Sequence, residues 1–129
     1  MKRILVVDDD PDTLEAVRIL LELNGYEVLT SSKGDDAVNN VVDFSPNIIM
    51  LDVYLKGSNG VEICNRLKSS SLTRHIPIIM FSAESNDYLI LRKCAADDFI
   101  AKPFDLKVLL AKVEQLLTQA KTGTEEVRA

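Results

Sequence analysis

The stretch that decides the fold is Ile4-Leu5-Val6-Val7-Asp8-Asp9-Asp10-Pro11. Its four apolar residues lack period-two alternation, which predicts a strand buried on both faces, as in the centre of a parallel sheet. The acidic residues then end the strand, and Asp10-Pro11 offers an N-cap followed by a proline for the first helical position. The stretch therefore predicts a buried strand that leads through an acidic turn into a helix.

Similar apolar runs recur along the chain. Two are as continuous as the first, at residues 48–51 and 76–81, and two are weaker and suit outer strands, at residues 27–30 and 99–101. Segments with helical spacing of leucine and valine separate them. Five strands that alternate with five helices imply right-handed crossovers, with helices on both faces of the sheet. We expect a three-layer α/β fold with a doubly wound parallel sheet.

Length and composition predict one domain, since 129 residues with 47% hydrophobic residues suffice for one packed core. We place this domain at residues 2–118. Residues 119–129 are polar and charged, which predicts a frayed tail or the start of a linker within a larger regulator or hybrid kinase. No apolar run approaches the roughly 18 residues that cross a bilayer, so we expect a cytoplasmic protein without a membrane partner.

The net charge of -5 and the scattered lysines and arginines offer no field attractive to phosphate backbones, so we expect no direct contact with nucleic acid. Cys64 and Cys94 lie outside any CxxC spacing and within apolar segments, which predicts buried free thiols. His75, the one histidine of the sequence, is predicted to lie in a surface loop.

Polar residues follow the predicted strands at their carboxyl ends, where reactive groups collect in open α/β sheets. The first strand ends at Asp8 and Asp9, the third at Asp52, the fourth at Ser82, and the fifth runs into Lys102. If the first and third strands are neighbours, their three carboxylates converge on one pocket. Lysine and hydroxyl groups would then lie beside the same pocket.

Three carboxylates at close range repel one another, and a hard cation removes that conflict. Oxygen ligands suit Mg²⁺, with Mn²⁺ as an alternative, and no His/Cys set supports another transition metal. Asp52 beside such a cation could attack a phosphoryl donor and form an acyl phosphate, while Lys102 and Ser82 meet the phosphoryl oxygens. Taken singly, the acidic triplet reads as an N-cap and Asp52 as the start of a turn; the joint pattern favours the reactive site.

These motifs resemble the receiver domains of bacterial response regulators, the CheY-like family of two-component systems, over residues 2–118. The matching stretches, in the family's order, are Ile4-Leu5-Val6-Val7-Asp8-Asp9-Asp10-Pro11, Ile49-Met50-Leu51-Asp52-Val53 and Asp97-Asp98-Phe99-Ile100-Ala101-Lys102-Pro103-Phe104. The resemblance implies a flavodoxin-like (βα)5 fold with strand order 2-1-3-4-5. It also implies a phosphorylation switch in a two-component system or phosphorelay, served by a histidine kinase or a phosphotransfer protein.

The resemblance assigns roles to individual residues. Asp52 is the phosphoacceptor, Lys102 contacts the phosphoryl group, and the metal ligands are Asp8, Asp9, Asp52 and the carbonyl of Tyr54. The chain would not be an enzyme beyond catalysing its own phosphoryl transfer and autodephosphorylation.

Further roles concern the readout of the switch. Ser82 is the switch hydroxyl, Phe99 takes the place of the aromatic that reports its state, and Tyr54 and Glu84 modulate the lifetime of the phosphoryl group. The peptide bond before Pro103 is expected to be cis.

Two departures from the family stand out. Phe99 replaces the tyrosine of many receivers, so only ring packing remains for the readout. Lys56 stands where the family usually has proline, which leaves the loop less restricted and adds a charge near the pocket rim.

The resemblance also implies partners: a downstream protein that binds the last two helices and strand, or a second copy in a phosphorylation-linked homodimer. Two other functions remain open on the sequence. One is a receiver-like binding module that works without phosphorylation. The other is a metal-dependent phosphohydrolase in which Asp8 is the nucleophile and Asp10 the acid and base.

Overall fold

The computed structural model describes residues 1–83 and 93–128, with side chains up to residue 119. Its centre is a parallel sheet in the order β2-β1-β3-β6-β7. The bounds of these strands are Glu27–Ser31 (β2), Arg3–Val7 (β1), Ile48–Asp52 (β3), Ile78–Ser82 (β6) and Asp98–Ala101 (β7). The predicted strand order is confirmed, and the two weaker apolar runs form the edge strands.

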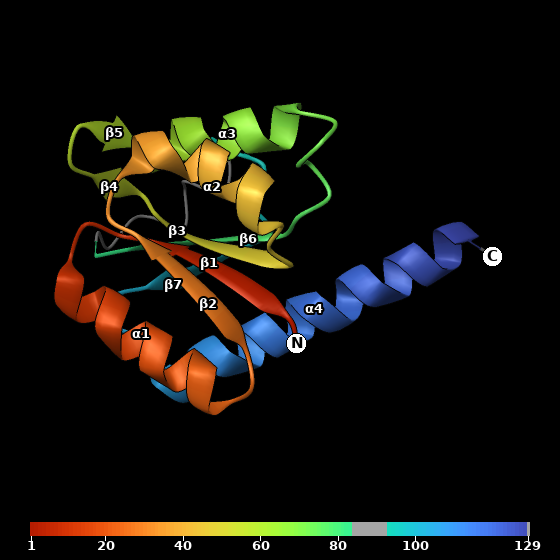
Figure 1. Ribbon diagram of the computed structural model, residues 1–129, viewed down its shortest axis with the longest axis horizontal. Helices are drawn as coiled ribbons and strands as arrows, with labels where there is room; N and C mark the ends of the chain where they lie inside the picture. The colour runs from red at the N-terminus through yellow and green to blue at the C-terminus, as the bar shows by residue number, and fades with distance from the viewer. Residues whose placement is uncertain (84–92, 129) are drawn as a thin grey trace.

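Helices cover both faces of the sheet (Figure 1). Helices α1 (Pro11–Leu23) and α4 (Leu106–Arg128) lie on one face, and α2 (Ala37–Phe44) and α3 (Gly60–Ser69) lie on the other. A single 3-10 turn, η1 (Gly34–Asp36), precedes α2. The three-layer α/β prediction is confirmed. The fifth helix that the alternation predicts, between β6 and β7, falls on residues 84–92, outside the described residues.

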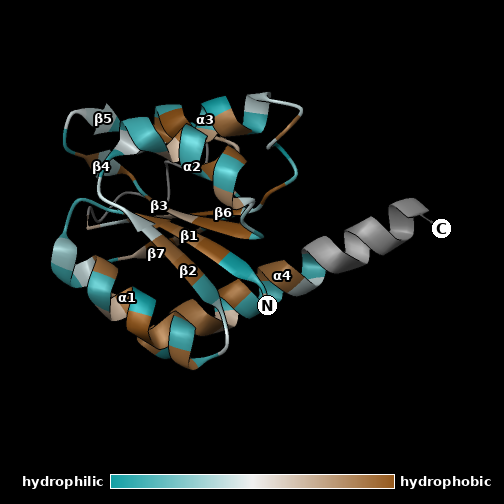
Figure 2. Cartoon of the chain, in the orientation of Figure 1, coloured by the Kyte–Doolittle hydropathy of each residue, from teal (hydrophilic) through white to brown (hydrophobic). Residues whose placement is uncertain are grey.

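The core explains why the strands lack alternation. Residues of β1 point alternately to two apolar clusters, Leu5 and Val7 toward α2 and α3, and Ile4 and Val6 toward α1 and α4. All four are fully buried, and the strand colours in Figure 2 are correspondingly hydrophobic. Since both faces of the central strands leave water, each position favours an apolar side chain.

The predicted N-cap and proline at the start of the first helix are confirmed, and two other helix ends carry comparable signals. The Asp10 side chain accepts a hydrogen bond from the Asp12 amide at the start of α1, and Pro11 takes the first helical position. Asn59 caps α3 by accepting hydrogen bonds from two backbone amides, at 2.8 and 3.3 Å. Helix α1 ends at Leu23; Asn24 is its C-cap and is followed by Gly25 with φ of 89°.

Two features differ from the sequence-based expectation. Helix α4 continues to Arg128, through the segment predicted as a polar tail, because glutamine, lysine and glutamate are good helix formers. A small antiparallel hairpin, β4 (Tyr54–Leu55) with β5 (Ser58–Asn59), follows Asp52. Strands of two residues carry too little pattern to be predicted.

The remaining structural expectations concern three side chains and the membrane. Cys64 and Cys94 are buried thiols that are not joined in a disulfide, and His75 is exposed, as predicted. In the described part of the chain, none of the helices combines the length and apolar character that a bilayer crossing requires.

Candidate functional site

The carboxyl edge of the sheet gathers the polar residues that the sequence singled out. Asp8 and Asp9 follow β1, while Asp52 ends β3, and each of the three offers a carboxylate oxygen within 4.8 Å of the others. They meet because β1 and β3 are paired neighbours, as the convergence argument requires. Asp8 and Asp52 are buried, with 0% and 5% of their surface exposed.

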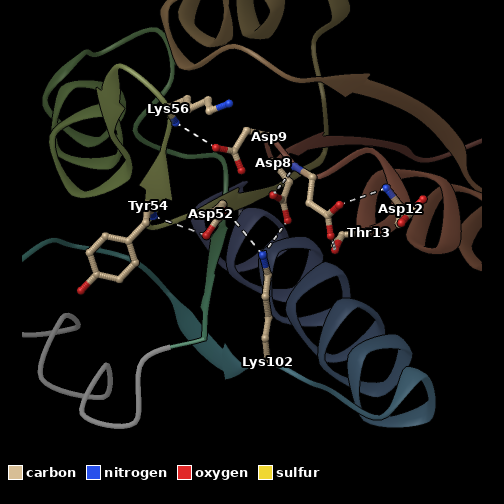
Figure 3. A network of polar contacts seen from close by, with 9 residues as sticks. Asp8, Asp9, Asp12, Thr13, Asp52, Tyr54, Lys56 and Lys102 are labelled. Atoms are coloured by element: carbon tan, nitrogen blue, oxygen red, sulfur yellow. Dashed lines mark hydrogen bonds and ion pairs between the residues drawn. The ribbon is translucent and has the colours of Figure 1, made fainter.

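Lys102 reaches into this cluster from the end of β7 (Figure 3). Its Nζ lies 2.7 Å from Oδ2 of Asp8 and 3.4 Å from Oδ2 of Asp52. The ammonium also lies 4.8 Å from the centre of the Phe81 ring. The backbone holds the lysine in register with the neighbouring strand, because the Lys102 amide donates to the Ser82 carbonyl at 2.7 Å.

Backbone amides orient each carboxylate. The Asp10 amide donates to Oδ1 of Asp8 at 3.0 Å, and the Tyr54 amide donates to Oδ1 of Asp52 at 3.4 Å. Asp9 accepts from the amide of Lys56 at 3.0 Å. The acidic side chains are therefore fixed by the chain itself, as well as by Lys102.

The electrostatics of the cluster follow from burial and from like charge. Burial raises the pKa of Asp52 to about 7, and the hydrogen bond with Asp8 and the charge of Asp8 act in the same direction. Burial alone would lower the pKa of Lys102, but its hydrogen bond to Asp8 and the charges of Asp52 and Asp8 outweigh that effect and raise it. The ammonium stays charged while the carboxylates carry excess negative charge.

Ser82 and Phe99 lie on neighbouring strands. Ser82 ends β6 and is fully buried, and it is paired in register with Ala101. Phe99 is half-buried on β7 and packs against the cluster that faces α2 and α3.

The other assigned positions are placed as follows. Tyr54 is 58% exposed, and its ring points away from the carboxylates (Figure 3). The peptide bond between Lys102 and Pro103 is cis. Glu84 lies outside the described residues.

Asp10 does not enter the cluster. Its carboxylate caps α1, accepting from the Asp12 amide at 3.3 Å and from the Thr13 hydroxyl at 2.6 Å. The hydrogen bond from Thr13 lowers the pKa of Asp10, so the group is poorly suited to protonate a leaving group. Asp8, the nucleophile of the phosphohydrolase alternative, is fully buried and lies closer to the Lys102 ammonium than Asp52 does, at 2.7 Å against 3.4 Å. The geometry therefore disfavours that alternative.

Two contributors to the site escaped the sequence analysis. The first is the backbone amide of Lys56. Its hydrogen bond to Asp9 depends on the β4–β5 hairpin, which the sequence pattern did not predict. The second is Gly60, the first residue of α3, where an added Cβ would meet the backbone of Asp52. A glycine inside a helical pattern is a poor helix former, and that was the available signal.

The donor set fits a hard divalent cation. Asp8, Asp9 and Asp52 together present carboxylate oxygens at mutual distances suited to one ion, and a single ammonium leaves their negative charge only partly compensated. Oxygen donors of this kind are those that Mg²⁺ prefers.

The fold and the site together define an α/β protein with an acidic cluster and a lysine at the carboxyl edge of its parallel sheet. A family model for the response regulator receiver domain matches residues 4–114, so the chain belongs to that family. This match confirms the resemblance read from the sequence. Receiver domains of this family are the phosphorylation switches of two-component systems.

Individual relatives agree. The chain is 38% identical to the phosphate regulon transcriptional regulatory protein PhoB of Pseudomonas aeruginosa, over 97% of this chain and 56% of PhoB. It is 36% identical to the DNA-binding response regulator MtrA of Mycolicibacterium smegmatis, over 90% of this chain and 50% of MtrA. The crystal structure of response regulator TrrA from Thermotoga maritima with Mg²⁺ and BeF superposes with a TM-score of 0.82 at 32% identity, covering 90% of this chain and 99% of TrrA.

The expectation that nucleic acid is no partner is wrong. MtrA is named for DNA binding, and PhoB is named as a transcriptional regulator. The chain spans about half the length of these curated relatives. Net charge describes only the residues that are counted, so the value of -5 for this chain has no bearing on DNA contacts made elsewhere in such proteins.

Proposed function

We propose that Asp52 accepts a phosphoryl group from a phosphohistidine of a histidine kinase or phosphotransfer protein, with Mg²⁺ bound at the acidic cluster. The single observation that carries this proposal is the convergence of three carboxylates and the Lys102 ammonium at one sheet edge. A buried cluster of this composition costs stability, because like charges are held together, and a role in binding accounts for it.

The cation would be held by carboxylates of Asp8, Asp9 and Asp52 and by the backbone carbonyl of Tyr54. When bound, it supplies positive charge that offsets the carboxylates and the phosphoryl oxygens. Mn²⁺ meets the same donor requirements.

The transfer step forms one bond and breaks another. A carboxylate oxygen of Asp52 attacks phosphorus, the bond between phosphorus and the histidine nitrogen breaks, and the departing imidazole takes its electron pair and a proton from solvent. Lys102, which lies between Asp8 and Asp52, can turn its ammonium to a phosphoryl oxygen with little movement. Ser82 is suited to donate its hydroxyl to another.

Loss of the phosphoryl group completes the cycle. Water attacks phosphorus, the acyl phosphate is cleaved, and inorganic phosphate and the Asp52 carboxylate are released; the chain catalyses no other turnover in this proposal. Tyr54 and Glu84 would set the rate. Since the Tyr54 ring points outward, shielding of the acyl phosphate requires the ring to swing over the pocket.

Phosphorylation would be read through Ser82 and Phe99. The new charge draws the Ser82 hydroxyl and Lys102 toward the phosphoryl group, and the shift of β6 opens space for the Phe99 ring to turn inward. A change from 1:99 to 99:1 requires about 5.5 kcal/mol of differential binding, which a charge-assisted network can largely supply.

The decisive experiment is a mass measurement after incubation with acetyl phosphate and Mg²⁺. The wild type should gain the mass of one phosphoryl group, and Asp52→Asn should gain none. Omission of Mg²⁺, with chelator present, should prevent the gain in the wild type. An unmodified wild type would instead favour the binding module that works without phosphorylation.

We infer that the regulated output is transcription, because the relatives PhoB and MtrA are named as a transcriptional regulator and a DNA-binding regulator. The test is chromatin immunoprecipitation of the protein expressed from its own gene, with Asp52→Asn as the matched variant. Enrichment of promoter DNA that depends on Asp52 would support this output. Enrichment of the wild type and of Asp52→Asn that stays at the background level would count against a transcriptional output.

A further inference from the structure

The backbone amide of Lys56 binds a carboxylate far away in the sequence. It donates to Oδ2 of Asp9 at 3.0 Å, joining two residues that are 47 positions apart (Figure 3). The bond connects the hairpin that follows Asp52 to the acidic turn that follows β1. Two of the strand ends that form the cluster are therefore linked at its rim.

The turn of the hairpin leaves this amide available. Leu55 pairs with Ser58, so Lys56 and Gly57 form a two-residue loop in which Gly57 has φ of 71°. In a β-turn the hydrogen bond runs from the fourth residue to the first, and the amide of the second residue is not used. Lys56 holds that second position, and its amide is directed to Asp9 instead.

The orientation of the Asp9 carboxylate depends on a single donor, whereas the Asp8 and Asp52 carboxylates each have two in the described part of the chain. Asp8 and Asp52 each contact Lys102 as well as a backbone amide. For Asp9, the Lys56 amide is the one hydrogen-bond donor found within residues 1–83 and 93–128. Asp9 is also the least buried of the three, so without the bond its side chain would sample several rotamers.

We propose that the backbone amide of Lys56 is a positioning group that orients the Asp9 carboxylate for the divalent cation. The inference rests on the metal site of the proposed function and adds to it a contact that depends on the residue at position 56. A proline at this position would have no N–H and could not make this bond. Groups that orient metal ligands in this way typically change metal affinity by about 10-fold to 100-fold when they are lost.

Two substitutions separate the amide from the side-chain charge. Lys56→Ala keeps the N–H and removes the ammonium, whereas Lys56→Pro removes both. Proline suits the second position of such a turn, and Leu55 before it is already extended in β4, so the variant is expected to fold. The comparison of Lys56→Pro with Lys56→Ala therefore isolates the amide.

The measurement is the Kd for Mg²⁺ by calorimetric titration of the three proteins, without any phosphoryl donor. We expect Lys56→Pro to bind about 10-fold more weakly than Lys56→Ala. Lys56→Ala should bind as tightly as the wild type, or slightly more tightly at low salt because a positive charge is gone. Equal affinities of the Ala and Pro variants would overturn the inference and leave the metal site intact. A wild type that binds no Mg²⁺ would overturn the metal site, and the inference with it.

Hydrogen exchange gives a readout that needs no proline variant. In the wild type, the Lys56 amide should exchange slowly for a turn position, and protection should persist or rise when Mg²⁺ saturates the site. Protection that disappears on Mg²⁺ addition would mean that the bond competes with the metal, and that outcome also overturns the inference. Circular dichroism shows whether Lys56→Pro is folded. If it is folded, the comparison of Kd values is the test; if it is not, hydrogen exchange of the wild type is the test.

Discussion

A Cβ atom on Gly60 would lie 2.1 Å from the carbonyl oxygen of Asp52 and 2.9 Å from the Cα of Val53. Both atoms belong to backbone, so no side-chain rotation can relieve the clash. The Gly60 amide also donates to the Val53 carbonyl at 2.9 Å, which holds the start of α3 against the end of β3. The position of Asp52, the proposed phosphoacceptor, is therefore set partly by the absence of a side chain at residue 60.

Gly60→Ala is expected to lower the free energy of unfolding by about 3 kcal/mol, the upper part of the range for overpacking. It should also slow phosphorylation by acetyl phosphate, since the end of β3 must move. Gly57→Ala is the matched control: its Cβ meets open space, and only the positive φ costs about 1 kcal/mol. Urea denaturation of both variants gives the comparison, and equal losses would contradict the steric explanation.

Removal of the ammonium between Asp8 and Asp52 should destabilise the protein in the absence of divalent cation. Lys102→Met leaves the fully buried Asp8 without its charged partner, and breaking a buried pair costs about 3 kcal/mol or more. The measurement is urea denaturation with chelator present. Phosphorylation of this variant should also be strongly reduced, because a positive charge on the phosphoryl oxygens is lost.

A double-mutant cycle separates this effect from a loss of packing. In Lys102→Met, the buried Asp8 carboxylate has lost its charged partner. Adding Asp8→Asn removes that uncompensated charge, so the double variant should regain part of the lost stability. A coupling energy of about 2 kcal/mol is expected for groups in direct contact. Strict additivity of the two substitutions would show that the ion pair is not the cause.

Much of the architecture could be predicted because burial on both faces imposes continuous apolar runs on β1, β3 and β6. The same reasoning located Asp8, Asp9 and Asp52, since residues at the carboxyl ends of adjacent parallel strands must meet. The neighbour relation of β1 and β3, however, came from the family resemblance, because the sequence of one chain does not state strand order.

What escaped prediction depends on contacts between backbone atoms. The bond from the Lys56 amide to Asp9 involves a group that almost every residue has, so no residue type signals it. At position 60 the glycine is the one signal, but it does not say which backbone atoms lie close to it. Helix α4 passed its predicted end because polar residues can continue a helix as readily as they can fray. Charge counting failed for the nucleic-acid partner because the chain spans about half the length of the relatives.

Lys68 supports the fold at the opposite edge of the sheet. Its Nζ donates to the Ile76 carbonyl at 2.8 Å and forms an ion pair with Asp97 at 2.8 Å, and its side chain is only 13% exposed. The Asp97 carboxylate also accepts from the Ile78 amide at 2.8 Å. This network joins α3 to the residues that begin β6 and β7.

Lys68→Met should cost about 2 kcal/mol of unfolding free energy, as expected for hydrogen bonds that involve a charged group. Lys107→Met, at an exposed position of α4, is the control and should change stability by about 0.5 kcal/mol or less. Since the network lies away from the carboxyl edge, phosphorylation of Lys68→Met by acetyl phosphate should match the wild type. If Lys68→Met loses no more stability than Lys107→Met, the Lys68 network does not stabilise the fold.

The Cys64 thiol provides a test of core integrity across pH. Burial raises the pKa of Cys64 from its ordinary value of 9.0 to about 12, and the charge of Cys94 and a hydrogen bond with it act in the same direction. The folded pKa is the higher one, so this thiol contributes stability that is fully present below pH 9 and is lost as the pH rises toward 12. In a Cys94→Ala background, alkylation of Cys64 at pH 8 should be at least about 100-fold slower than in urea, because little thiolate forms and the group is enclosed. Folded and unfolded protein reacting at similar rates would mean that α3 does not keep Cys64 in the core.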